Sequence, residues 1–181
     1  MTKALQDKRI AVLMTDGVEQ VEYTGPREFL EQQGARVTLI SPKAKGEQVQ
    51  GFNHADPADK FTVELTVSDA RPGDFDALVL PGGVSNPDAL RLEQDAIKFI
   101  RDFGREDKLI AAICHGPWTL IDAELVKGKQ ITSWPSLQRD LQNAGAEWRD
   151  EQVVVDGKLI TSRKPDDIPA FNQAIQQALA A

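Results

Sequence analysis

Residues 109–117 read LIAAICHGP, an apolar run that ends in a cysteine and continues into a histidine, a glycine and a proline. A continuous apolar run predicts a strand that is buried on both faces, as in the middle of a parallel sheet. Because proline is well tolerated in the first turn of a helix, a helix should follow directly and extend to about residue 123. The stretch therefore predicts a parallel-sheet α/β fold with a sharp strand-to-helix turn at Cys114.

The residues around Cys114 are small at the two positions where such a turn requires it. In the related Gly-x-Ser-x-Gly turn, the residues two before and two after the nucleophile must be small because strand and helix nearly touch. Ala112 and Gly116 meet this requirement. We predict that Cys114 is a nucleophile whose pKa a helix start lowers toward neutrality. The alternative is a buried structural cysteine.

The alternation of strands and helices extends along the whole chain, which we predict to be a single domain over residues 1–181. Its length fits one compact domain. Buried strands are predicted at residues 9–14, 36–41, 76–80 and 109–113, helices at 21–34, 87–103, 136–144 and 166–181, and a hairpin at 153–161 around Asp156-Gly157. Residues 43–67 predict loops and a small hairpin layer. This order predicts a doubly wound parallel sheet with right-handed crossovers.

Composition narrows the class of protein. The chain has 21 Lys and Arg against 28 Asp and Glu, a net charge of −7, which opposes nonspecific binding to nucleic acid or anionic membranes. A single cysteine cannot form an intramolecular disulfide, and no Cys/His cluster has zinc spacing, so we expect neither a metal nor a cofactor. The polar start, followed by only about five apolar residues, is too short for an export signal, and we expect a cytoplasmic protein.

Three loops should meet where the strands end. In a doubly wound sheet the ligand crevice lies beyond the carboxyl ends of the strands, and the loops after the first, third and fourth strands hold Glu19, Gly83 and Cys114. Glu19 could reach the thiol. His115 is either an acid/base partner, a donor of its backbone N–H to an oxyanion together with Gly83, or a structural histidine. We expect His54, in a separate loop, to be exposed.

Five segments of the sequence resemble the ThiJ/PfpI family of cysteine enzymes, whose members are called intracellular proteases, glyoxalases or deglycases. The segments are residues 16–22 (DGVEQVE), 75–83 (FDALVLPGG), 111–117 (AAICHGP), 143–148 (NAGAEW) and 153–163 (VVVDGKLITSR). The resemblance implies a flavodoxin-like, class I glutamine amidotransferase-like fold. It also implies that Cys114 is the nucleophile, that Glu19 is the acid that hydrogen-bonds the thiolate and moves protons, and that Gly83 and His115 supply the oxyanion N–H groups.

The same resemblance implies a homodimer or a higher oligomer. In PfpI-type members an acidic residue after the Pro-Gly-Gly turn comes from a neighbouring subunit to orient the histidine, and Asp88 is the nearest match. It is an aspartate where the archetype has a glutamate, and the turn is one residue longer. Glutamine amidotransfer is excluded because its base is a distant C-terminal histidine, and no histidine follows His115.

Three functions remain open from the sequence. In the first, the Cys114 thiolate adds to an aldehyde such as methylglyoxal, or to its adduct on an amine, and Glu19 moves the proton, so that lactate or glycolate results. In the second, a peptide is hydrolysed through an acyl-thioester with His115 as base and a partner subunit's aspartate, at the position of Asp88, as its orienter. In the third, the protein is not an enzyme but a redox sensor that acts through Cys114, or a stress chaperone.

Overall fold

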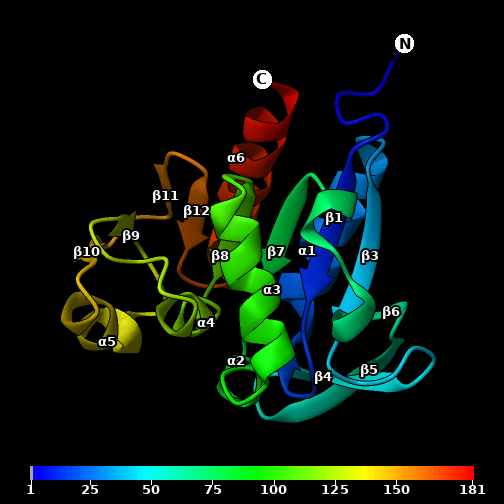
Figure 1. Ribbon diagram of the computed structural model, residues 1–181, viewed down its shortest axis with the longest axis horizontal. Helices are drawn as coiled ribbons and strands as arrows, with labels where there is room; N and C mark the ends of the chain where they lie inside the picture. Colours follow the sequence, from blue (N-terminus) through cyan, green and yellow to red (C-terminus); the bar gives the residue numbers. More distant parts are fainter. Residues whose placement is uncertain (1) are drawn as a thin grey trace.

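A seven-stranded sheet forms the centre of the computed structural model, which describes residues 2–181 (Figure 1). In spatial order its strands are β11 (Val153–Asp156), β12 (Leu159–Ser162), β8 (Leu109–Ile113), β7 (Ala77–Leu80), β1 (Arg9–Leu13), β3 (Arg36–Ser41) and β6 (Leu65–Thr66). Every neighbouring pair is parallel except β11 and β12, which form the predicted hairpin. The predicted doubly wound, flavodoxin-like sheet is confirmed.

Helices cover both faces of the sheet, which explains why its strands are apolar throughout. Along β1, Ile10 and Val12 join one core cluster while Ala11 and Leu13 join the other. The first cluster includes residues of α1 (Gln20–Gln32) and α6 (Ile168–Ala180), and the second includes residues of α3 (Gln94–Arg105), α4 (Trp118–Asp122) and α5 (Gln138–Asn143). Successive strand side chains point to opposite faces, so each must be apolar when both faces are covered.

Two smaller sheets extend the molecule. One contains the three strands β2 (Val18–Glu19), β4 (Gln48–Asn53) and β5 (Asp56–Thr62). The other contains the two strands β9 (Gln130–Ile131) and β10 (Glu147–Trp148). The β4–β5 hairpin is the small layer that the sequence predicted, and it lies with α2 (Ser85–Leu90) at the end of the molecule opposite to the termini (Figure 1). Short 3-10 helices occupy Val67–Asp69, Pro72–Asp74, Pro135–Leu137 and Pro165–Asp167.

The helix predicted at residues 87–103 is two helices, α2 and α3. The chain leaves the helical conformation before α3, where Glu93 is extended with φ −92° and ψ 102°. The apolar side chains that suggested one long helical face belong to α3 alone. Pro26 lies inside α1.

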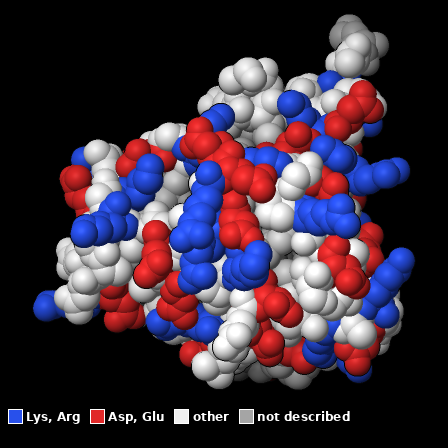
Figure 2. Space-filling model, viewed as in Figure 1, with Lys and Arg blue, Asp and Glu red and all other residues white. Residues whose placement is uncertain are grey.

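The face that carries α3 is mixed in charge. Figure 2 shows acidic and basic side chains interspersed over it rather than gathered in an area of one sign. None of the helices within residues 2–181 has the length and apolar character needed to cross a bilayer.

Candidate active site

Cys114 lies on a strained turn directly after β8. Its φ of 63° is in the left-handed region, which a residue with a side chain adopts only when its surroundings enforce it. The surroundings do so here, because the Cys114 N–H donates to the Ser162 carbonyl at 3.0 Å and its carbonyl accepts from the Trp134 N–H at 2.9 Å. A Cβ added to Gly116 would lie 2.5 Å from the Leu80 carbonyl oxygen. The structure thus has the tight elbow that the small flanking residues predicted.

The carboxyl group beside the thiol is that of Glu22, not that of Glu19. Glu22 is fully buried in the first turn of α1, and its Oε1 accepts the Gly82 N–H at 2.9 Å. A Cβ added to Gly82 would lie 2.6 Å from this oxygen and 2.7 Å from the Cys114 Cβ, so the carboxyl group lies beside Cys114. Glu19 lies one helical turn earlier, in β2, and both of its carboxylate oxygens are 3.2 Å from the His54 backbone nitrogen. The prediction that Glu19 hydrogen-bonds the thiol is therefore not met, because the Glu19 carboxylate is held at the His54 backbone nitrogen instead.

A signal for Glu22 was present in the sequence. Glu22, Pro26 and Leu30 are spaced four residues apart and all three are buried, so they share the face of α1 that packs on the sheet. A carboxyl group on such a face needs a partner or a chemical role, since burying an isolated charge is costly. Its Oε2 has no regular hydrogen-bond partner within the described part of the chain, which leaves it available to exchange a proton with the thiol.

Burial dominates the protonation of this pair. It is the main reason that the pKa of Glu22 is raised to about 8; the Gly82 N–H opposes this rise and the nearby charge of Glu19 contributes to it. Burial and then the charge of Glu22 also raise the pKa of the Cys114 thiol, while the backbone N–H groups of Gly83 and His115 lower it. The predicted lowering of the thiol pKa is not met, because burial and the charge of Glu22 outweigh the two backbone N–H groups that favour the thiolate. The two groups instead lose their first proton as a coupled pair.

Two backbone N–H groups lie near the sulfur, as the sequence predicted for an oxyanion site. Those of Gly83 and His115 both favour the Cys114 thiolate. Gly83 has a φ of 76°, and a Cβ there would be 2.3 Å from the Gly17 carbonyl oxygen. The close approach of this turn to the strand before α1 therefore requires glycine, and it holds a donor beside the reacting atom.

The imidazole of His115 lies against the sulfur. Its Nδ1 is 3.3 Å from the Cys114 Sγ, and the ring is buried, which lowers its pKa. Trp134 stacks on the ring at a centroid distance of 5.8 Å, and Trp118 meets it edge-on at 5.1 Å. These two tryptophans therefore fix the orientation of the histidine.

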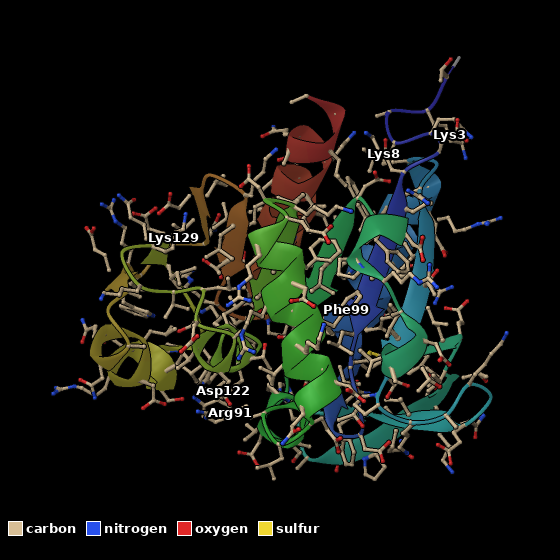
Figure 3. All side chains as sticks on the ribbon, viewed as in Figure 1. Lys3, Lys8, Arg91, Phe99, Asp122 and Lys129 are labelled. Carbon is tan, nitrogen blue, oxygen red and sulfur yellow. The ribbon has the colours of Figure 1, made fainter. Side chains whose placement is uncertain are left out.

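Trp118 is held in turn from outside the site. The Arg91 guanidinium lies over its ring, 5.6 Å from the centroid, and its indole N–H donates to Asp140 at 2.9 Å. Arg91 also forms an ion pair with Asp122 at 3.1 Å, and Figure 3 shows the two side chains next to one another between α2 and α4. This chain of contacts ties α2 to the turn that carries Cys114.

An open cavity of about 370 Å³ lies over the sulfur. Its lining includes the residues around the sulfur, Cys114, Glu22, His115 and Gly83, and also Glu19 and His54. The β4–β5 hairpin contributes further apolar wall, as does Trp134. Of the predicted site residues, only Asp88 lies apart from it: it is exposed on α2 and does not line the cavity of its own chain.

The chain matches a known protein family along most of its length. The model of the DJ-1/PfpI family matches residues 8–178. The chain belongs to the DJ-1/PfpI family. Relatives at similar length support the assignment. A Bacillus subtilis protein provisionally named cysteine protease YraA is 45% identical over 92% of this chain and 95% of its own. "Protein/nucleic acid deglycase 2" of Escherichia coli is 42% identical over 96% of this chain and 99% of its own.

Solved structures of DJ-1/PfpI proteins have the same fold. Drosophila melanogaster DJ-1beta superposes with a TM-score of 0.86 at 30% identity, over 97% of this chain and 91% of that one. A two-domain protein of Anabaena variabilis, with DJ-1/ThiJ/PfpI-like and ferritin-like domains, gives a TM-score of 0.90 at 36% identity. It matches 96% of this chain but 48% of its own, consistent with a match to one of its two domains.

Proposed function

We propose that this DJ-1/PfpI chain is a cysteine-dependent hydrolase that acts on reactive carbonyls and on their adducts with amines. The observation that carries the proposal is the pairing of Cys114 with a buried carboxyl group, Glu22, whose pKa of about 8 keeps it protonated at neutral pH. A nucleophile beside a protonated acid suits a reaction that needs both addition to a carbonyl and movement of a proton. The names of two relatives, a deglycase and general stress protein 18 of Bacillus subtilis, support a role under stress.

The reaction can be written through groups that the site contains. The Cys114 sulfur adds to the aldehyde carbon of methylglyoxal, and the N–H groups of Gly83 and His115 stabilise the resulting oxyanion. Glu22 gives its proton to this oxyanion, and the carboxylate so formed takes the proton from the same carbon and delivers it to the neighbouring carbonyl carbon. As the hydroxyl proton moves to the neighbouring oxygen, the hemithioacetal becomes a lactoyl thioester. Water hydrolyses the thioester to lactate and frees the thiol. For an adduct on an amine, the sulfur first displaces the amine, which leaves with a proton from Glu22.

Product analysis tests this proposal. When isotopically labelled methylglyoxal, or its adduct on an arginine derivative, is incubated with the protein, we expect labelled lactate and, in the second case, the free amine. Protein quenched during turnover should carry the label on Cys114, detectable by mass spectrometry of the peptide. If labelled lactate forms no faster than in protein-free buffer, the proposal is wrong.

The distance of 3.3 Å between the His115 Nδ1 and the Cys114 Sγ favours a second candidate, peptide hydrolysis with His115 as the base. In this candidate the chain forms a homo-oligomer, and an aspartate at the position of Asp88 in a second copy orients the imidazole. The exposure of Asp88 on α2 leaves it free to reach another subunit.

For this candidate, Asp88→Asn should reduce the hydrolysis of a fluorogenic peptide at least about tenfold, because an imidazole without its orienting carboxylate is a poorer base. Glu93→Gln, a matched change at another exposed carboxylate near α2, is the control. Sedimentation of the same samples gives the oligomeric state. A monomer with full peptidase activity would exclude the shared site.

A further inference from the structure

Glu19 is held firmly at the wall of the cavity although it does not contact the thiol. Its backbone N–H donates to the Gly82 carbonyl at 3.4 Å, beside the turn that carries the Gly83 N–H. Each of its two carboxylate oxygens lies 3.2 Å from the His54 backbone nitrogen, and its side chain is only 13% exposed. The position of this charge relative to the sulfur is therefore fixed from two sides.

The charge of Glu19 has no fixed counter-ion inside the cavity. Among residues 2–181, no lysine or arginine lines it. The His54 imidazole is 90% exposed, with its Nδ1 3.9 Å from Glu19 Oε1. Arg163 is near Pro165 of the cavity wall but forms ion pairs with Asp150 and Asp167, and Lys164 is not a lining residue. A partly desolvated carboxylate without a cation attracts a positively charged ligand and repels an anionic one.

We propose that Glu19 selects substrates by charge, favouring carbonyl compounds that carry a positively charged nitrogen and excluding those that carry a carboxylate. An ammonium or guanidinium group attached near the reacting carbon would lie against Glu19 while that carbon meets Cys114. The inference rests on the proposed function for the reaction that follows, but the charge preference itself is a property of access to the sulfur. Glu19 is thus a specificity residue, whereas Glu22 is the residue that exchanges the proton.

Alkylation of Cys114 tests the preference without any enzymatic turnover. Cys114 is the single cysteine of the chain, so alkylation of thiol groups reports on it alone. Iodoacetamide and iodoacetate are nearly the same size and differ in charge. Relative to free N-acetylcysteine, we expect the wild-type protein to favour iodoacetamide over iodoacetate by about tenfold or more at low ionic strength, and added salt should reduce this ratio. 2-Bromoethylammonium should be favoured further.

Glu19→Gln removes the charge and keeps an oxygen that can accept the His54 N–H. We expect it to reduce the iodoacetamide-to-iodoacetate ratio about tenfold, toward that of the free thiol. Asp56→Asn is the control. Asp56 is an exposed carboxylate on the β4–β5 hairpin, which also carries His54, but Asp56 itself does not line the cavity. A purely structural role for Glu19 would change both alkylation rates by the same factor. An equal ratio in wild type and Glu19→Gln, or a wild-type ratio equal to that of the free thiol, would overturn the inference.

Substituted phenylglyoxals extend the test to turnover. The ratio of kcat/KM for a 4-trimethylammonio compound over a 4-carboxy compound should fall about tenfold or more in Glu19→Gln, again without a fall in Asp56→Asn. If the wild-type protein converts neither these compounds nor methylglyoxal but keeps the alkylation preference, the proposed function fails and the charge selection stands. If both are converted with a ratio that Glu19→Gln leaves unchanged, the function stands and the charge selection is wrong.

Discussion

Replacing Cys114 by alanine is expected to reduce lactate formation from methylglyoxal by at least about 10⁴-fold, to the rate of protein-free buffer. The proposed reaction passes through a bond to this sulfur, and loss of a covalent nucleophile has effects of this size in other enzymes. The rate of lactate formation at saturating methylglyoxal, followed over time in the variant and in wild type, measures this reduction.

Cys114→Ser is the matched control for this substitution. It keeps the shape of the side chain but replaces a thiol by a much weaker nucleophile, so its rate should stay within about tenfold of the alanine variant. Both variants should unfold within about 2 kcal/mol of wild type, because only a small side chain changes. Turnover in Cys114→Ala at more than a tenth of the wild-type rate would mean that the sulfur is not the reacting group.

Glu22→Gln is expected to lower kcat/KM for methylglyoxal by about a hundredfold to ten-thousandfold, the usual contribution of a positioned acid or base. The amide preserves the shape of the carboxyl group and can still accept the Gly82 N–H, but it cannot carry a proton between carbons. Wild-type Cys114 should be alkylated faster as pH rises through about 8, where the pair loses its first proton. In Glu22→Gln this rise should move to higher pH, and an unchanged midpoint would contradict the coupling.

Stability gives a check on Glu22 that is independent of activity. Its pKa is raised from 4.5 in the unfolded chain to about 8 in the folded protein, so between these values the native state binds the extra proton and wild-type stability falls as pH rises. The Glu22→Gln variant has no such titrating group, so its stability does not show this fall. Its free energy of unfolding relative to wild type should therefore increase from pH 4.5 to pH 8, by at most about 5 kcal/mol. Urea unfolding at the two pH values measures the difference, and a constant difference would mean that the carboxyl group is ionised in the folded protein.

The sequence predicted the parts of the site that follow from strand ends. The apolar run before Cys114 indicated a buried strand, and the small residues Ala112 and Gly116 indicated the tight turn. Gly83 could be placed because a parallel sheet brings the ends of its strands to one edge. These features depend on short segments whose burial is visible as a pattern of residue types.

The choice between Glu19 and Glu22 could not be made in the same way. The two acids are three residues apart, and both the predicted start of the helix at residue 21 and the observed start at Gln20 fall between them. Which of the two reaches the thiol depends on how α1 packs on the sheet, and a helix boundary does not reveal this. The raised thiol pKa also escaped prediction, because it depends on the extent of burial and on the charge of Glu22 beside the sulfur. Two-residue strands such as β2 are too short to show any periodicity.

The cavity is built from two kinds of structure that differ in their tolerance of change. Its floor lies at the ends of the strands and contains Gly82, Gly83 and Gly116. The atoms there are packed so closely that a Cβ added to any of these glycines would collide with a neighbouring atom. Its rim on the side of Glu19 is a hairpin attached to the preceding strand by a ladder of two residue pairs, Val18 with Gly51 and Glu19 with Phe52. A designer who wished to change which molecules enter could therefore graft a different loop onto this hairpin and leave the chemical apparatus below it intact.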